Sequence, residues 1–168
     1  MGVSLTEKSN LWPAIKQALK ETQKSHVAVG WPSESSKTKE AHDTVSGMSN
    51  VQVATANEIG SAPGVRPVVP ARPMVAETAR RIEVPAKKLT AELLKQITEG
   101  KMSVKVALGR IGRYAQGELK QSIRMPAGGW KAANATMTKA KKGSDVPLVD
   151  TGKLFQSVTY AVRMRGGR

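Results

Sequence analysis

Apolar residues recur at steps of three and four between residues 103 and 123, and this periodicity predicts a long amphipathic helix. The apolar positions are Val104, Leu108, Ile111, Ala115, Leu119 and Ile123. The opposite faces carry Lys105, Arg110, Arg113 and Lys120. Gly109, Gly112 and Gly117 each cost about 1 kcal/mol relative to Ala inside a helix. We therefore expect another helix or another subunit to pack closely against this helix.

Near the C-terminal end of the sequence, a turn is followed by a strand. Asp150 or Thr151 can cap a helical turn, and Gly152 allows a tight bend. The alternation over 157–163 then predicts a strand with one buried face. Asp-Thr-Gly is also the signature of aspartic proteases. However, Lys153 follows where the retroviral type has a small residue, and too few residues remain for the rest of that fold. We therefore expect a structural turn without catalysis.

The remaining elements are read from periodicity and caps. They are a helix over 9–24, a strand over 26–32, a helix from Ser49 to Gly60 with Gln52 completing a capping box, and a helical segment over 74–99 that Pro85 kinks or splits. In the helix from Ser49 to Gly60 the apolar stripe is Val51, Thr55 and Ile59. The segment over 74–99 has two stripes: the first is Val75, Ala79 and Ile82, and the second is Leu89, Leu93 and Ile97 with Ala86.

These elements predict a single α+β domain over residues 1–168. We expect a small, mostly antiparallel sheet of roughly three or four strands, packed against roughly two or three helices, with long extended loops. Strands beyond the two clear ones would lie in 64–70 or 145–149, or come from a neighbouring chain. The expected mobile parts are the loops 33–48 and 125–146 and the flexible tail 164–168.

Prolines stiffen residues 61–73, at positions 63, 67, 70 and 73, so this run is extended and cannot be a central strand. Val69 and Met74 are among the residues that make it apolar. A rigid apolar loop can pack on its own domain or dock on a partner, and both alternatives remain open. Arg72 can pair with a carboxylate such as Glu58 or reach a neighbouring chain.

The formal charge of +14 is unevenly placed. Residues 85–168 hold 17 Lys and Arg against 5 Asp and Glu, whereas residues 1–84 hold 10 against 8. A basic half predicts a polyanionic neighbour, which is nucleic acid or an acidic protein surface. Aromatic residues are only 4%, which argues against stacking of single strands. The candidate DNA-facing residues of the basic arm are Lys131, Lys139, Lys141 and Lys142.

Several classes of site are disfavoured by residues that the sequence lacks. There is no Cys, and His26 and His42 are isolated, so we expect no metal and no cofactor. No apolar run approaches the ~20 residues of a membrane helix, and no signal-peptide hydrophobic region is present. We therefore expect a soluble protein without a membrane partner.

Three motifs occur in an order that resembles the neck and tail-completion proteins of long-tailed bacteriophages, also described as virion morphogenesis proteins. They are Ala56-Asn57-Glu58-Ile59-Gly60, then Val69-Pro70-Ala71-Arg72-Pro73-Met74, then 143–154 leading into 157–162. The helix over 103–123 is also similar to that family, and the resemblance covers residues 50–163. The sequence departs from the family at Ile59 and Met74, where Phe is common.

The resemblance implies a structural subunit and no enzyme activity. Such a subunit would form a homo-oligomeric ring, of about six or twelve copies, at the head–tail junction through which DNA passes. Its partners would be other neck and tail proteins, namely the connector and the tail tube or terminator, and packaged DNA without sequence readout. It would be assembled in the host cytoplasm and located in the virion.

The ring hypothesis assigns subunit or partner contacts to a set of apolar and polar residues. They are Val69, Pro70, Arg72, Pro73, Met74, Trp130, Leu148, Asp150 and Leu154. The alternative is a basic nucleic-acid-binding protein that acts without sequence readout and does so as an isolated chain.

Overall fold

The computed structural model describes residues 11–35, 47–61, 64, 70–124 and 152–164. The described helices are α1 (Leu11–Lys24), α3 (Asn50–Ile59), α4 (Met74–Thr98), α5 (Val104–Arg124) and α7 (Lys153–Ser157), and the described strands are β1 (His26–Gly30) and β2 (Thr159–Arg163). The architecture is thus α+β, with helix dominant. None of the helices described is both long and apolar enough to cross a bilayer.

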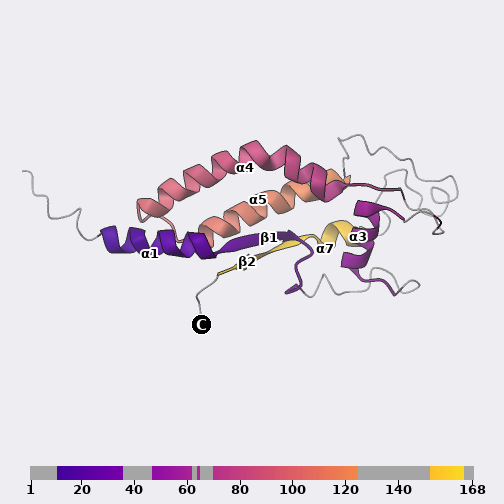
Figure 1. The fold of residues 1–168 in the computed structure, drawn as a ribbon, viewed down its shortest axis with the longest axis horizontal. Coiled ribbons are helices and arrows are strands. Elements are labelled where there is room, and N and C mark those ends of the chain that lie inside the picture. The colour runs from indigo at the N-terminus through magenta and orange to yellow at the C-terminus, as the bar shows by residue number, and fades with distance from the viewer. Residues whose placement is uncertain (1–10, 36–46, 62–63, 65–69, 125–151, 165–168) are drawn as a thin grey trace, which may run out of the picture.

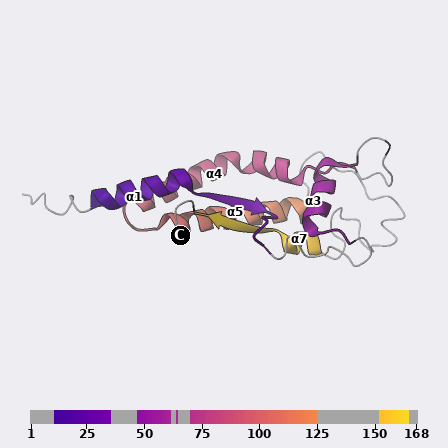
Figure 2. The same cartoon turned by 60° about the horizontal axis from the view of Figure 1, so that its bottom comes forward.

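The fold is an elongated stack built on α5 (Figure 1). Helices α4 and α5 run antiparallel and pack along their lengths, and the β1–β2 sheet packs against α5. Helix α1 lies at one end of the molecule, while α3 and α7 lie at the other (Figures 1 and 2). The amphipathic periodicity over 103–123 is explained by this arrangement, because α5 buries one side against α4 and another against the sheet.

The sheet joins two segments from opposite ends of the described chain. Strands β1 and β2 pair antiparallel, from His26 opposite Arg163 to Gly30 opposite Thr159. Both predicted strands are confirmed, and they are the only two among the described residues. Of the segments suggested for further strands, 145–149 and 65–69 lie outside the described residues, as do 36–46 of the first predicted loop and the whole arm 125–146.

Close packing explains why residue 112, one of the three glycine positions in α5, has no side chain. A Cβ at this position would lie 2.5 Å from Cδ2 of Tyr160 and 2.8 Å from Cγ2 of Val27, closer than side-chain atoms can approach. The expected close packing is therefore confirmed here, although the partner is the sheet and not a helix or a second subunit. At Gly109 and Gly117 a Cβ would meet nothing within 4 Å, so packing explains neither.

Two apolar cores lie along α5. One, at the α3–α7 end, consists of Ala54, Met74, Leu119, Ile123, Leu154 and Val158. The other, near the α4–α5 turn, consists of Leu93, Ile97, Val104 and Ala107. Burying an apolar side chain contributes about 1.5–3 kcal/mol, so both clusters hold α5 in place.

Helix α4 takes one of the two forms predicted for it and differs from the prediction in its buried face. It is continuous through Pro85 and curved, so the segment bends without splitting (Figure 1). In its first half the buried positions are Met74 and Thr78, whereas Val75 of the predicted stripe is 40% exposed. Thr78 takes a buried position because its hydroxyl donates to the Met74 carbonyl of its own helix at 2.6 Å and forms a second hydrogen bond with the Ser122 hydroxyl of α5 at 2.7 Å.

Candidate subunit-contact surface

Arg72 and Asn57 join the first two motifs of the resemblance. The Arg72 backbone N–H donates to the Asn57 carbonyl at 2.6 Å, and its Nη1 donates to Asn57 Oδ1 at 3.1 Å. Asn57 in turn donates from Nδ2 to the Val53 carbonyl at 2.8 Å, inside α3. The Arg72 side chain is buried, and this burial lowers the pKa of its guanidinium below its usual value. A hydrogen bond to a charged group contributes more than a neutral one, so this pair fixes the Pro-rich segment to α3.

Glu58 provides the N-terminal cap of α4. Its Oε2 accepts from the Val75 N–H at 2.9 Å and its Oε1 accepts from the Ala76 N–H at 3.0 Å. These donors lack partners within the helix, and a carboxylate at this end also interacts favourably with the helix dipole. Pairing with Glu58 was one of two alternatives for Arg72; in the structure the Glu58 carboxylate caps α4, and Arg72 bonds to the neighbouring Asn57.

Helix α3 begins and ends as its sequence predicts. Ser49 accepts from the Gln52 N–H while Gln52 accepts from the Ser49 N–H at 2.8 Å, which completes the capping box. Gly60 ends the helix with φ 74°, and its N–H donates to the Ala56 carbonyl. The positive φ favours glycine, because a Cβ is strained there.

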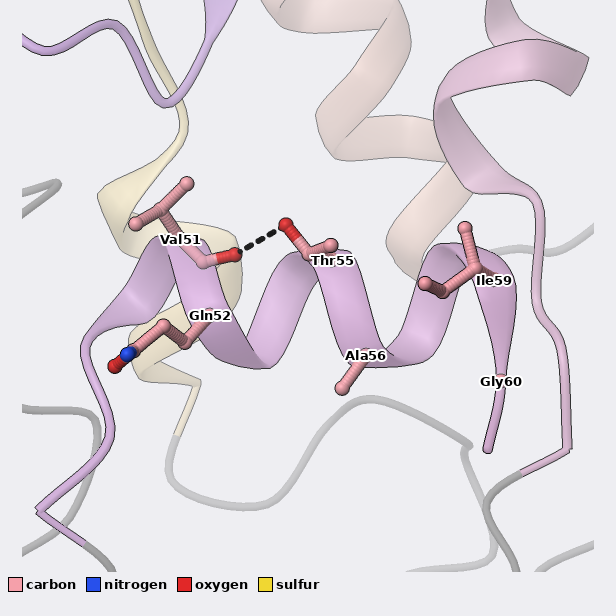
Figure 3. Close-up of a pocket in the computed structure, with 6 residues that line it drawn as sticks. All are labelled: Val51, Gln52, Thr55, Ala56, Ile59 and Gly60. Atoms are coloured by element: carbon pink, nitrogen blue, oxygen red, sulfur yellow. Dashed lines mark hydrogen bonds between the residues drawn. The ribbon is translucent and has the colours of Figure 1, made fainter. Parts of the chain in front are cut away.

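The apolar stripe of α3 faces outward. Ile59 is 71% exposed and Val51 is 37% exposed, whereas the buried residues of this helix are Asn50 and Ala54. The side chains of Val51 and Ile59 help to line a shallow hollow of about 370 Å³ on the surface. The hollow is formed by Val51, Gln52, Thr55, Ala56, Ile59 and Gly60 (Figure 3). We call this the α3 groove.

The α3 groove offers shape and apolar contact and no reactive group. The Thr55 hydroxyl donates to the Val51 carbonyl at 2.9 Å, so it is used within the helix (Figure 3). The lining residues include no ionisable side chain. In the rest of the described chain, too, no group of three or more His, Cys, Asp or Glu side chains is placed to hold a metal ion. The groove is therefore suited to receive an apolar side chain.

The third motif reaches the same end of the molecule. Gly152, with φ 72°, is the N-cap residue of the short helix α7, which confirms the predicted turn before the strand, whereas Asp150 and Thr151, predicted as caps, lie outside the described residues. Helix α7 contacts α3 and α5. Ser157 at its end accepts from Trp31 Nε1 at 2.8 Å and donates to the Leu154 carbonyl. The described parts of the three motif segments, residues 56–60, 70–74 and 152–154, thus lie together around α3 (Figures 1 and 2).

The structure places the predicted contact residues in three groups. Pro70 and Pro73 are half-buried beside α3. Arg72, Met74 and Leu154 are buried, with Met74 0% and Leu154 1% exposed, so these side chains pack within the single chain. Outside the described residues lie Val69, Trp130, Leu148 and Asp150, as well as the predicted DNA-facing Lys131, Lys139, Lys141 and Lys142.

The apolar surface that the structure does expose at this end was not assigned to partner contact from the sequence. It comprises Val51 and Ile59 of α3 and Val75 of α4. The available signal was the narrowness of the α3 stripe, which left too little apolar surface for a helix with a buried face.

No protein-family model, no curated protein and no solved structure matches this chain.

Proposed function

We propose that this chain is a structural subunit of a tailed-bacteriophage virion. It assembles with copies of itself into a ring at the neck, as a head–tail joining or tail-completion subunit, and DNA passes through the ring. The single observation that carries the proposal is that the described parts of the three motif segments lie together at one end of the molecule, beside an exposed apolar groove. The likeness of these motifs to neck and tail-completion proteins supplies the identity of the assembly.

A ring gives the exposed apolar side chains a role. Contacts around a ring are heterologous, so one surface of a subunit must match a different surface of the next. The α3 groove, with Ile59 and nearby Val75, provides one apolar surface of this kind. The polar bonds between Arg72 and Asn57 hold the groove rigid, so little conformational entropy is lost when a neighbour docks.

The proposal is tested by the mass of the full chain in solution and by electron microscopy of the particles. Light scattering over a range of concentrations should show a defined oligomer, and negative-stain images should show rings. Val51→Asp with Ile59→Asp should abolish or strongly weaken assembly, because two carboxylates would be buried without partners. Val84→Asp with Val106→Asp is the matched control, since Val84 of α4 is 61% exposed and Val106 of α5 is 51% exposed.

Two results would contradict the proposal. One is a chain that stays monomeric at every concentration, and the other is normal assembly by the double α3 variant. Location is tested separately by labelling intact virions with an antibody to this chain. Label at the head–tail junction supports the proposed role, whereas label confined to the tail fibres or to the capsid faces contradicts it.

A further inference from the structure

The solvent face of α5 carries a row of cations. Arg110, Arg113, Lys120 and Arg124 are separated by three, seven and four residues, so with 3.6 residues per turn they lie on one side of the helix. At 1.5 Å per residue the row is about 21 Å long. Gly117 lies midway between the two pairs of cations, where a Cβ would meet nothing within 4 Å.

Within the described part of the chain, no carboxylate neutralises this row. The one acidic residue of α5, Glu118, faces α4 and pairs with Arg81 at 3.0 Å. Lys120 and Arg124 lie over the Phe155 ring, at 5.3 and 5.4 Å from its centroid. A cation–π contact positions a cation but leaves its charge in place. Arg110 and Arg113 are exposed and form no ion pair with any residue that the structure describes.

We propose that this row, which we call the α5 cationic face, binds the phosphate backbone of duplex nucleic acid without reading its sequence. Charge complementarity supports this partner, because cations alone suffice for phosphate contacts. The length of the row corresponds to about six base pairs at 3.4 Å each. Gly117 gives the backbone of the duplex room for close approach, which would account for a helix-weakening residue that no packing explains.

Two other polyanions fit the face less well. An acidic protein partner would normally add an apolar centre to its interface, but none of the large exposed apolar residues among those described lies between Arg110 and Arg124. Single-stranded nucleic acid is held largely by stacking on aromatic rings. The aromatic ring beside this face, Phe155, is already in contact with Lys120 and Arg124.

The inference does not require that the chain forms a ring. A ring would place several copies of the face around a shared axis and so raise the effective concentration of cations along a passing duplex. The free chain should bind the same ligand more weakly, through one face.

The test is fluorescence anisotropy of a labelled duplex of about 20 base pairs, titrated with the full chain between about 50 and 200 mM salt. Arg110→Gln with Arg113→Gln removes two cations of the face. Lys87→Gln with Lys88→Gln is the matched control, because it changes the net charge equally on the exposed side of α4. Arg113→Glu serves as a second, single variant, and thermal melts check that each protein is folded.

We expect the α5 double variant to bind at least about tenfold more weakly at about 100 mM salt, and the α4 control to change affinity less than about twofold. The slope of log K against log salt should fall by about 1.8, since each lost phosphate contact removes about 0.9. The inference is overturned if the two double variants weaken binding equally, if neither does, or if the α5 variant loses binding to polyglutamate but not to duplex.

Light scattering on the same samples separates this inference from the proposed function. A chain that binds duplex through the α5 cationic face yet stays monomeric supports the inference and contradicts the ring. If the chain forms rings, but the unaltered protein and the variant with Arg110→Gln and Arg113→Gln bind duplex equally well, the ring is supported and the inference is overturned.

Discussion

The guanidinium of Arg72 donates to the side-chain oxygen of Asn57 at 3.1 Å, while the backbone of Arg72 donates to the backbone of Asn57 at 2.6 Å. The two residues are thus joined twice, through main chain and side chain. Because Arg72 is buried, its charge depends on such acceptors, and the position of the Pro-rich segment depends on this pair.

Asn57→Ala should therefore destabilise the fold. A buried guanidinium loses an acceptor, and a hydrogen bond to a charged group contributes about 1.5–3 kcal/mol. Urea unfolding followed by circular dichroism gives the change in the free energy of unfolding. Asn57→Asp keeps an acceptor for Arg72 and loses only the donor to the Val53 carbonyl, so its loss should be smaller. Equal losses in both variants would show that the Arg72 bond is not the important one.

Glu58→Ala should weaken the start of α4. Removal of a side-chain cap typically costs about 0.5–2 kcal/mol, and here two backbone donors, at Val75 and Ala76, lose their acceptor. Hydrogen exchange at these two amides should accelerate. Glu92→Ala, on the exposed side of the same helix, should change the free energy of unfolding by less than about 0.5 kcal/mol. Unchanged exchange at Val75 and Ala76 would contradict the capping role.

The glycines of α5 should respond in opposite directions to alanine. Gly112→Ala forces a methyl group against Tyr160 and Val27, and overpacking of this kind costs about 1–3 kcal/mol. Gly117→Ala meets open space and should stabilise the helix by up to about 1 kcal/mol. The midpoints of urea unfolding of the two variants test this directly. A destabilising Gly117→Ala in the monomer would reveal a packing partner for that position.

Glu34 should make stability depend on pH. The hydrogen bond from Arg163 lowers the pKa of Glu34 from its usual 4.5 to about 2. A lowered folded-state pKa gives a stabilising contribution that is complete above pH 4.5, declines as the pH falls, and is lost below about pH 2. The melting temperature of the unaltered protein should therefore exceed that of Glu34→Gln at pH 6 by a margin that narrows on acidification.

Arg163→Gln provides the control for this effect. Glu34 follows β1 and Arg163 ends β2, with Nη2 of Arg163 3.0 Å from Oε2 of Glu34. In the Arg163→Gln protein, which lacks the guanidinium, the further change Glu34→Gln should leave the pH dependence of the melting temperature unchanged. If the difference in melting temperature between the unaltered protein and Glu34→Gln stays constant from pH 6 to pH 2, the assignment is contradicted. Salt should reduce this difference because both groups are exposed.

Sequence periodicity predicted those parts of the fold that depend on neighbouring residues. The apolar steps along 103–123 gave α5, Ser49 and Gln52 gave the start of α3, and the alternation over 157–163 gave β2. Each of these signals arises from residues within one element, where helical or strand geometry fixes which side chains share a face. The predicted turn at Gly152 belongs to the same class.

The contacts that shape the candidate surface could not be predicted in this way. Arg72 meets Asn57 across a loop, and Thr78 meets Ser122 across two helices, so neither pair leaves a periodic pattern. The outward direction of Ile59 was missed because an apolar stripe on a short helix normally faces a core. Only the three-dimensional arrangement shows that Ala54 and Asn50 take that place.

The antiparallel pairing of β1 with β2 has a kinetic consequence. Val27 lies opposite Val162 in the sheet, so most of the described chain lies between the two partners. The helical hairpin of α4 and α5 needs only short-range closure, whereas the sheet must close the longest loop in the fold. During synthesis β1 is therefore unpaired, and Val27 and Val29 lack their strand partner until β2 has emerged from the ribosome. A nascent chain halted before β2 should be cleaved by protease near β1. A chain halted after residue 163 has left the ribosome should resist cleavage there.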